Sequence, residues 1–228
     1  MFRLATPLCL ASCVAMVFLA GCSSRRGSAA GAPGRPWRHV VTFDRMDLDK
    51  PPRHFSVDQT HEGGTPVWLV TRDPQDAGRG RVLAQLSTDP TRGRYPLCIY
   101  DDFVGRDVAV SVRFKAMTGQ VDQAAGIVVR YHDRNNYYVT RANALEGNVR
   151  FYKVQEGKRT QLATADLEVT ARQWHTLEIQ AEGPRFDVSY DGRRVIQAED
   201  QTFSEPGRVG LWTKADSLTC FDDFKLRP

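Results

Sequence analysis

Short segments of alternating apolar and polar residues, separated by tight-turn residues, fill the second half of this chain. In residues 107–115 (DVAVSVRFK) an apolar side chain occupies every second position, which is typical of a strand with one buried face. Asp191-Gly192 lies between two such segments and indicates a two-residue hairpin turn. No segment keeps an apolar period of about 3.6 residues long enough for a major helix. The sequence therefore predicts an all-β fold, an antiparallel two-sheet sandwich or barrel. Further strands are expected at residues 124–131, 137–142, 148–154, 174–181, 185–190, 193–198, 207–213 and 219–226.

The first 22 residues have the pattern of an export signal. Arg3 precedes an apolar run over residues 4–20, and the run closes on the sequence LAGC, which ends at Cys22. A basic start, a short apolar core and small residues before a cleavage point are typical of an export signal. LAGC resembles the lipobox at which bacterial lipoproteins are cut and acylated on the cysteine. The alternative, a transmembrane helix, needs roughly 20 apolar residues, and polar residues and a proline interrupt this run. We expect a signal peptide over residues 1–21 and a lipid on Cys22.

Residues 22–36 are expected to form the lipidated cysteine and a flexible tether, and residues 37–228 a single domain. The stretch SSRRGSAAGAPGRP contains no apolar residue larger than Ala or Pro, a composition typical of flexible linkers. Several acyl chains hold a protein on a membrane almost permanently. Among lipoproteins, a serine such as Ser23 in place of Asp after the lipidated cysteine is typical of sorting to the outer membrane. We therefore expect a membrane-anchored protein of the bacterial cell envelope, facing the periplasm or the cell surface.

The charge pattern does not indicate a nucleic-acid partner. The chain has 31 Lys and Arg residues against 27 Asp and Glu residues, and the predicted signal peptide contains only Arg3 from this set. The basic residues are spread along the chain and do not form the block or stripe that is typical of nucleic-acid binding.

Two cysteines, Cys98 and Cys220, remain in the predicted domain. In an oxidising compartment the two thiols could form a disulfide, and each could equally be a small buried hydrophobic residue. The sequence leaves both alternatives open because it does not give the separation of the two residues. The Cys and His spacing matches no zinc motif, so a zinc site is not expected.

Several stretches of the second half resemble a known family. They are residues 123–159, QWHTLEI at 173–179, GRVGLWTKAD at 207–216 and FDDF at 221–224. Together they resemble concanavalin A-like jelly-roll domains of bacterial secreted proteins, laminin-G-like modules, and the DUF1080 group, which is named for 3-keto-disaccharide hydrolases. The resemblance implies a jelly-roll sandwich that contacts a sugar or glycan on its concave sheet, often with a structural calcium ion. Because the same sandwich serves lectins, glycosidases and adhesion modules, it indicates fold more than function.

The chain lacks the acid motif of jelly-roll glycosidases. Laminarinase-type enzymes carry ExDxxE on one strand, because hydrolysis needs an acid and a base or nucleophile on the same face. Neither ExDxxE nor ExDxE occurs here. Asp101-Asp102 and Asp222-Asp223 are adjacent pairs, so within a strand their carboxylates point to opposite faces. His132 and His175 are isolated. We therefore expect no glycosidase site of this kind, and no catalytic residue is assigned.

Alternation places a set of cationic and aromatic side chains on one sheet face. Val149 and Phe151 are expected to face the core, which puts Arg150 and Tyr152 on the opposite face. If neighbouring strands behave alike, their outer side chains form a patch that suits a sugar carboxylate or sulfate, held by a bidentate guanidinium. The alternative is that these arginines are solvated or paired with carboxylates. The expected ligand-binding residues are Arg130, Arg141, Asn143, Arg150, Tyr152, Trp212 and Lys214.

Two further features have a structural interpretation. Trp174 opens an expected strand, and in similar domains a tryptophan here closes the core, so we expect packing and not binding. The calcium implied by the resemblance would need several oxygen ligands. Asp222 and Asp223, near the end of the domain, are the expected ligands, and no other cofactor is expected. Further carboxylates near the start of the domain are Asp44, Asp47 and Asp49.

The sequence thus predicts an envelope lipoprotein whose jelly-roll domain binds a glycan or glycoconjugate without catalysis. A hydrolase acting on a 3-keto-disaccharide or a related glycoside is the first alternative, and a structural or protein-contact domain is the second. An open aromatic groove would favour binding over a structural role. Two carboxylates about 5–10 Å apart on the same face would favour an enzyme.

Overall fold

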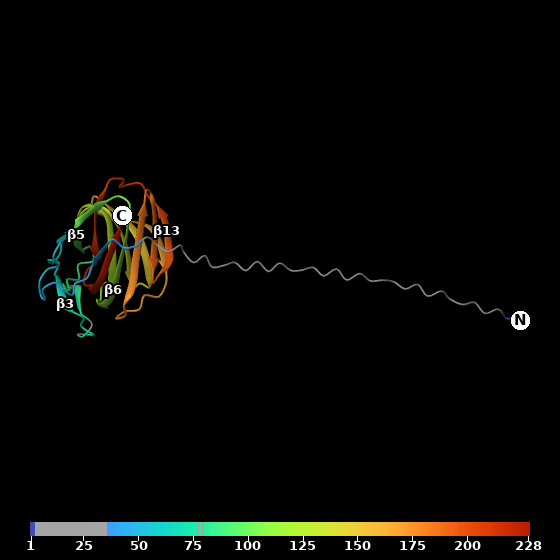
Figure 1. The fold of residues 1–228 in the computed structure, drawn as a ribbon, viewed down its shortest axis with the longest axis horizontal. Coiled ribbons are helices and arrows are strands. Elements are labelled where there is room, and N and C mark those ends of the chain that lie inside the picture. Colours follow the sequence, from blue (N-terminus) through green and yellow to red (C-terminus); the bar gives the residue numbers. More distant parts are fainter. Residues whose placement is uncertain (3–35, 77, 79) are drawn as a thin grey trace. The chain divides into compact units, whose positions relative to one another are not determined.

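The computed structural model describes residues 1–2, 36–76, 78 and 80–228. Residues 3–35 lie outside this set, and with them most of the predicted signal peptide, Cys22 and nearly all of the predicted tether. The described residues from Pro36 to Pro228 form one compact unit built from two β-sheets, shown in Figure 1. The described residues include no helix long and apolar enough to cross a membrane.

The strands pair antiparallel in an eight-stranded and a seven-stranded sheet. The strands of the eight-stranded sheet are β1 (His39–Val41), β3 (Trp68–Arg72), β4 (Arg81–Gln85), β6 (Val108–Thr118), β11 (His175–Glu182), β12 (Arg185–Tyr190), β13 (Arg193–Glu199) and β15 (Leu218–Arg227). Those of the seven-stranded sheet are β2 (Phe55–Thr60), β5 (Tyr95–Gly105), β7 (Ala124–Asp133), β8 (Asn136–Asn143), β9 (Asn148–Gln155), β10 (Lys158–Asp166) and β14 (Gly207–Trp212). The first sheet has the order β13-β12-β11-β6-β15-β4-β3, with β1 also paired to β15, and the second has the order β10-β9-β8-β7-β14-β5-β2.

The all-β fold predicted from the alternation is confirmed. Asp191 and Gly192 join β12 to β13, and both have positive φ values of 48° and 76°, as the central residues of a type I′ hairpin turn do. The alternation does not reveal β1–β5 or β10. Tyr95–Tyr100 of β5 is buried on both faces, so it contains no regular polar positions, and β10 is an edge strand whose residues are mostly exposed or half-buried.

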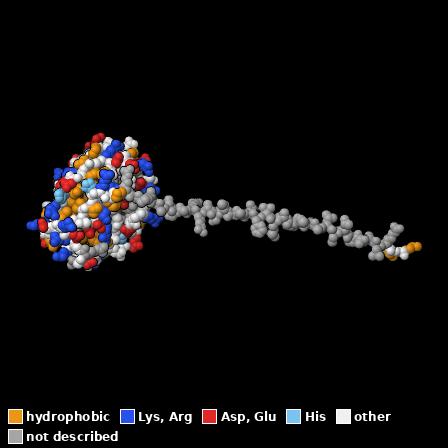
Figure 2. Space-filling view, viewed as in Figure 1, with side chains coloured by type: hydrophobic (Ala, Val, Ile, Leu, Met, Phe, Trp, Pro, Cys, Tyr) orange, Lys and Arg blue, Asp and Glu red, His pale blue; other side chains and the backbone are white. Residues whose placement is uncertain are grey.

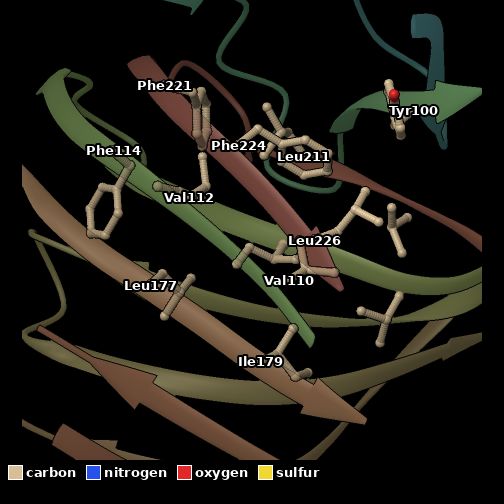
Figure 3. Packing of buried hydrophobic residues seen from close by; sticks show 14 of the residues in the cluster. Tyr100, Val110, Val112, Phe114, Leu177, Ile179, Leu211, Phe221, Phe224 and Leu226 are labelled. Carbon is tan, nitrogen blue, oxygen red and sulfur yellow. The ribbon is translucent and has the colours of Figure 1, made fainter. Parts of the chain in front are cut away.

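The main core lies between the two sheets. In β6, the side chains of Val110, Val112 and Phe114 enter it at every second position, and Leu211 of β14 and Phe221 of β15 meet them there (Figure 3). All five side chains are 0% exposed. Burying one such side chain contributes about 1.5–3 kcal/mol, so this layer holds the two sheets together.

A smaller buried cluster lies on the outer face of the eight-stranded sheet. There Lys115 Nζ is 2.5 Å from Asp73 Oδ1, and Trp174 Nε1 donates a hydrogen bond to Asp73 Oδ2 at 3.2 Å. The Trp174 ring centroid lies 4.9 Å from Lys115 Nζ. Burial acts to raise the pKa of Asp73, but the hydrogen bonds and charge around it, chiefly from Lys115, lower that pKa below its ordinary value. Trp174 therefore packs, as predicted, but over a buried ion pair and not in the core between the sheets.

The disulfide alternative for Cys98 and Cys220 is wrong. Both are free and fully buried thiols. Cys98 faces the core between the sheets, whereas Cys220 belongs to the cluster on the outer face of the eight-stranded sheet. Burial raises the pKa of both thiols, that of Cys220 to about 12. Each cysteine therefore acts as a small buried hydrophobic residue.

Charged side chains of both signs are interspersed on the surface of the domain. Figure 2 shows acidic and basic side chains side by side on the face that it presents, without a field of a single sign. Several form ion pairs, such as Arg208 with Asp101 at 2.8 Å. The acidic and basic residues, which are nearly balanced in number, are therefore also intermixed on the surface.

Candidate functional site

Four neighbouring strands of the seven-stranded sheet bring Trp212, Gly126, Arg141 and Arg150 into one row. Gly126 of β7 lies opposite both Trp212 of β14 and Arg141 of β8, and Arg141 lies opposite Arg150 of β9. The residues next to them in sequence face the core between the sheets for the most part, so the row lies on the outer face of the sheet. Tyr152 follows two positions along β9 on this same face. The structure thus brings together four of the predicted binding residues.

Gly126 allows this row to pack closely. A Cβ atom at this position would lie 2.8 Å from the Thr140 carbonyl oxygen, 3.2 Å from Trp212 Cε3 and 3.3 Å from Arg141 Cβ. The indole ring and the stem of the arginine therefore occupy the space that a side chain on β7 would need. Glycine in a strand interior often marks such a close approach.

Aromatic rings gather beside the row. The ring centroids of Tyr95 and Trp212 are 5.3 Å apart, and Tyr137 and Tyr152 are buried in the same cluster. The Arg159 guanidinium lies 4.8 Å from the Tyr95 centroid, 4.5 Å from the Tyr152 centroid and 5.9 Å from the Trp212 centroid. A cation is attracted to ring faces because these carry the negative part of the ring quadrupole. We call Tyr95, Tyr137, Tyr152, Trp212 and Arg159 the outer-face cluster.

The seven-stranded sheet is curved around this cluster, whose side chains fill the inside of the curve. Arg159 comes from β10 at one end of the sheet, and Tyr95 comes from β5, five strand positions away. In a flat sheet, five steps of roughly 4.8 Å would separate these strands by about 24 Å, yet the guanidinium approaches the Tyr95 centroid to 4.8 Å. The hydroxyls of Thr60 on β2 and Tyr137 on β8 are likewise only 2.8 Å apart. The sheet therefore curls towards its outer face.

Two arginines of the row share the carboxylate of Glu146, which lies in the loop between β8 and β9. Glu146 Oε2 is 2.8 Å from Arg141 Nη2 and 2.9 Å from Arg150 Nη1. Arg141 also donates to Asn148 Oδ1 and to the Tyr152 hydroxyl. Burial acts to raise the pKa of Glu146, but the two arginines outweigh burial, and the pKa lies below its ordinary value. Glu146 is therefore ionised at neutral pH and neutralises part of the predicted cationic patch.

Asn143 and Lys214 meet at Asp122, near Arg141. Asn143 Nδ2 donates to Asp122 Oδ1, and Lys214 Nζ donates to Asp122 Oδ2. The Asp122 side chain is 1% exposed. Burial raises the pKa of Asp122 above its ordinary value, although the hydrogen bond and charge of Lys214 oppose this shift. Both predicted residues thus lie at this site, where they bind a buried carboxylate.

Arg130 does not share this face, and its predicted place in the patch is wrong. The pairing of β7 with β8 is irregular after Val129, and Arg130 has a positive φ of 49°. Such a bulge shifts the alternation, so the Arg130 side chain turns into the sandwich, 5.0 Å from the Phe186 ring centroid. It donates to the backbone oxygens of Arg106 at 3.0 Å and Phe203 at 2.9 Å. Arg130 therefore joins loops at one end of the sandwich, where it lines an open depression of about 330 Å³.

The outer face is also less open than the alternation predicts. Trp212 is 0% exposed and Arg141 is 2% exposed, so these two side chains do not lie on a wet surface. The accessible polar groups lie around them, with exposures of 17% for Lys214, 31% for Arg150 and 34% for Glu146. We call Glu146, Arg150 and Lys214 the rim.

Several residues of the site are missed by the sequence analysis. Arg159 lies on β10, whose polar sequence shows no alternation and so does not indicate which side chains lie on which face of the sheet. Glu156-Gly157 in the sequence is a turn signal, and extending a strand beyond that turn would place Arg159 opposite Val154, on the outer face. Tyr95 carries no local signal because it lies on β5, whose strand the alternation does not reveal, and Asp122 carries none because it lies in the loop between β6 and β7.

The carboxylates predicted to bind calcium do not fit a metal site. Asp223 has a positive φ of 52° and faces two cations, Arg113 and Lys225, each 3.6 Å away. Burial raises the pKa of the neighbouring Asp222, which disfavours its charged form. Across the part of the chain that the structure describes, no group of three or more His, Cys, Asp and Glu side chains is placed to hold a metal ion. The carboxylates at the start of the domain therefore do not complete a site with Asp222 and Asp223.

Comparison with known protein sequences identifies relatives of part of this chain. Residues 104–211 match the family model of the β-xylosidase C-terminal concanavalin A-like domain. The levanase of Bacillus subtilis is 34% identical over 79 residues, which make up 35% of this chain and 12% of the levanase. The match therefore covers only a small part of that enzyme.

Solved structures show the same fold over most of the domain. The carbohydrate-binding module CBM66 from Bacillus subtilis has a TM-score of 0.60 at 20% identity, over 75% of this chain and 95% of the module. Domain 4 of an extracellular GH43 arabinanase from Geobacillus stearothermophilus, in complex with arabinotriose, has a TM-score of 0.52 at 14% identity, over 82% of this chain and 89% of that domain. The chain therefore has a concanavalin A-like jelly-roll fold of the kind found in carbohydrate-binding modules.

Proposed function

We propose that the jelly-roll domain binds a glycan or glycoconjugate at the outer face of the seven-stranded sheet, without cleaving it. The observation that carries the proposal is the rim, a set of solvent-accessible polar side chains of both charge signs beside the buried outer-face cluster. In ligand sites, a few placed polar groups fix the orientation of the bound molecule. The rim supplies such groups, with both donors and acceptors within reach of solvent. The fold shared with a carbohydrate-binding module and with a domain complexed to arabinotriose supports the proposal.

Arg150→Ala tests the proposal with little risk to the fold, because Arg150 is 31% exposed and belongs to the rim. Truncating a binding anchor costs about 2 kcal/mol or more, which is roughly thirty-fold in affinity. The full chain, purified in detergent, would be applied to a glycan array and then titrated against the glycan that binds best. Arg113→Ala is the matched control, because Arg113 is 26% exposed and lies on the outer face of the other sheet.

A thirty-fold loss in Arg150→Ala with unchanged affinity in Arg113→Ala would support the outer face as the binding site. Unchanged affinity in both variants would place the ligand elsewhere on the domain. If the wild-type chain binds no glycan, a structural or protein-contact domain of the envelope is the better interpretation.

We also propose that a lipid on Cys22 anchors the chain in the bacterial cell envelope, at the outer membrane. The LAGC sequence and the polar tether that follows it support this proposal. Mass spectrometry of the protein extracted from membranes should find Cys22 at the amino terminus with acyl chains attached. An intact residue 1 on the mature, membrane-extracted protein would contradict the anchor.

A hydrolase acting on a 3-keto-disaccharide or related glycoside is the second candidate, and Asp122 and Glu146 favour it. Their environments shift their pKa values in opposite directions, as an acid and a base in a glycosidase require. Both carboxylates are, however, already engaged, Asp122 by Asn143 and Lys214 and Glu146 by two arginines. Turnover of a 3-keto-disaccharide by the wild-type chain, abolished in Asp122→Asn, would establish the hydrolase and overturn the non-catalytic proposal.

A further inference from the structure

Arg159 differs from the other cations of the outer face because no carboxylate is paired with it. Arg141, Arg150 and Lys214 each bind a carboxylate of this face. Among the ion pairs formed by the described residues, none includes Arg159, and its Nη1 atom is buried without a hydrogen-bond partner. The guanidinium is held instead against the rings of the outer-face cluster.

Contacts with rings leave the hydrogen-bonding capacity of this guanidinium unused. The group carries five N–H donors in one plane, and a buried donor without an acceptor is costly. The Arg159 side chain is half-buried, so part of it is accessible to solvent. A pair of acceptor oxygens that entered from the solvent would meet a preformed, unpaired cation.

The two carboxylates of the site restrict where an anion can bind. Glu146 and Asp122 lie by Arg141, Arg150 and Lys214. An anionic ligand would have to displace one of these carboxylates from its cation, against the repulsion between like charges. At Arg159 there is no carboxylate to displace, so the anion specificity that the sequence suggests for Arg141 and Arg150 fits Arg159 better.

We propose that Arg159 is the specificity-determining residue of the outer face and that it binds a carboxylate or a sulfate ester carried by the glycan. This inference rests on the proposed function. The planar guanidinium matches the two oxygens of such a group. Tyr152 and Trp212, both buried, hold its plane in place. The ligand class is therefore an acidic glycan.

The test uses glycans in matched pairs, each present in an anionic and a neutralised form. Uronic acid oligosaccharides are paired with their methyl esters, and sulfated oligosaccharides with the desulfated sugars, so that the two sources of negative charge are distinguished. The full chain in detergent should bind the anionic member of at least one pair about tenfold or more tightly, the value expected for hydrogen bonds to a charged group. Arg159→Gln should remove this preference, and Arg159→Lys should retain only part of it, because lysine keeps the charge and loses the planar donors.

Arg208→Gln is the matched control. Arg208 also lies over a tyrosine of this face, 5.2 Å from the Tyr131 ring centroid, but it is paired with Asp101 at 2.8 Å. Its substitution should leave the preference unchanged, and thermal unfolding should show that each variant is folded. Equal binding of both members of every pair by the wild-type chain would overturn the inference while leaving glycan binding intact. A preference that survives in Arg159→Gln would also overturn it. Absence of binding to any glycan would refute the proposed function itself, and the inference with it.

Discussion

Replacing Lys115 by methionine should destabilise the domain by about 3–5 kcal/mol at neutral pH, because it leaves Asp73 as a buried charge without a partner. The Lys115 and Asp73 side chains are 3% and 1% exposed, so water cannot take the place of the missing cation. Methionine keeps much of the lysine stem, and the loss therefore reports mainly on the charge and not on a cavity. The double variant Lys115→Met/Asp73→Asn should recover part of the loss, because a neutral amide costs less to bury than a carboxylate.

The loss of stability in Lys115→Met should depend on pH, in a direction that the structure determines. In the wild-type domain the pKa of Asp73 lies below its ordinary value. The stability that this carboxylate contributes is therefore present above the pKa of the unfolded chain and is lost as the pH falls through the folded pKa. In Lys115→Met, burial is no longer opposed by the lysine, and the pKa of Asp73 should rise above its ordinary value. The penalty is then present above the raised pKa and disappears as the carboxyl takes up a proton.

A double-mutant cycle would measure these free energies of unfolding. It compares the wild type, Lys115→Met, Asp73→Asn and the double variant by urea unfolding at pH values of about 7 and about 4. Arg113→Met is the control. Arg113 lies on the same strand, also 4.9 Å from the Trp174 ring centroid, but is 26% exposed, so its loss should cost less than about 1 kcal/mol. A loss below about 1 kcal/mol in Lys115→Met, or a loss that is the same at both pH values, would refute the reasoning.

Three further predictions test other parts of the structure. Gly126→Ala should destabilise the domain by about 1–3 kcal/mol, because the new Cβ meets Trp212 and the facing strand. Urea unfolding measures this change, and an unchanged unfolding midpoint would show that the neighbouring groups can move apart to accommodate the methyl group. Arg130→Met should cost more than about 2 kcal/mol by the same assay, because the buried carbonyl of Phe203 and the part-buried carbonyl of Arg106 lose their donor, while glycan affinity stays unchanged. Cys98 and Cys220 should resist a thiol reagent in the native domain and react only after unfolding. If either thiol of the folded domain reacted as fast as an exposed thiol, this would contradict its burial.

The predictions that succeeded depend on counting along single strands. The alternation in residues 148–154 correctly places Val149 and Phe151 in the core and Arg150 and Tyr152 on the outer face, because successive side chains of a strand point to opposite faces. The same counting fails for Arg130, where a bulge and a positive φ change the alternation. An arginine gives no local signal for such a backbone conformation, since it is glycine that usually adopts it.

The amino-acid sequence by itself determined that the domain is all-β, where most strands of its second half lie, and which side chains of each strand share a face. These properties are local, because they follow from the two-residue period of a strand and from the turn residues. Only the tertiary structure decided which faces meet and which charges are paired. Arg159 and Tyr95 touch across five strand positions because the sheet is curved, and Asp122 neutralises Lys214, which lies far from it along the chain. Curvature and pairing arise from contacts between residues distant in sequence, and no pattern along one strand records them.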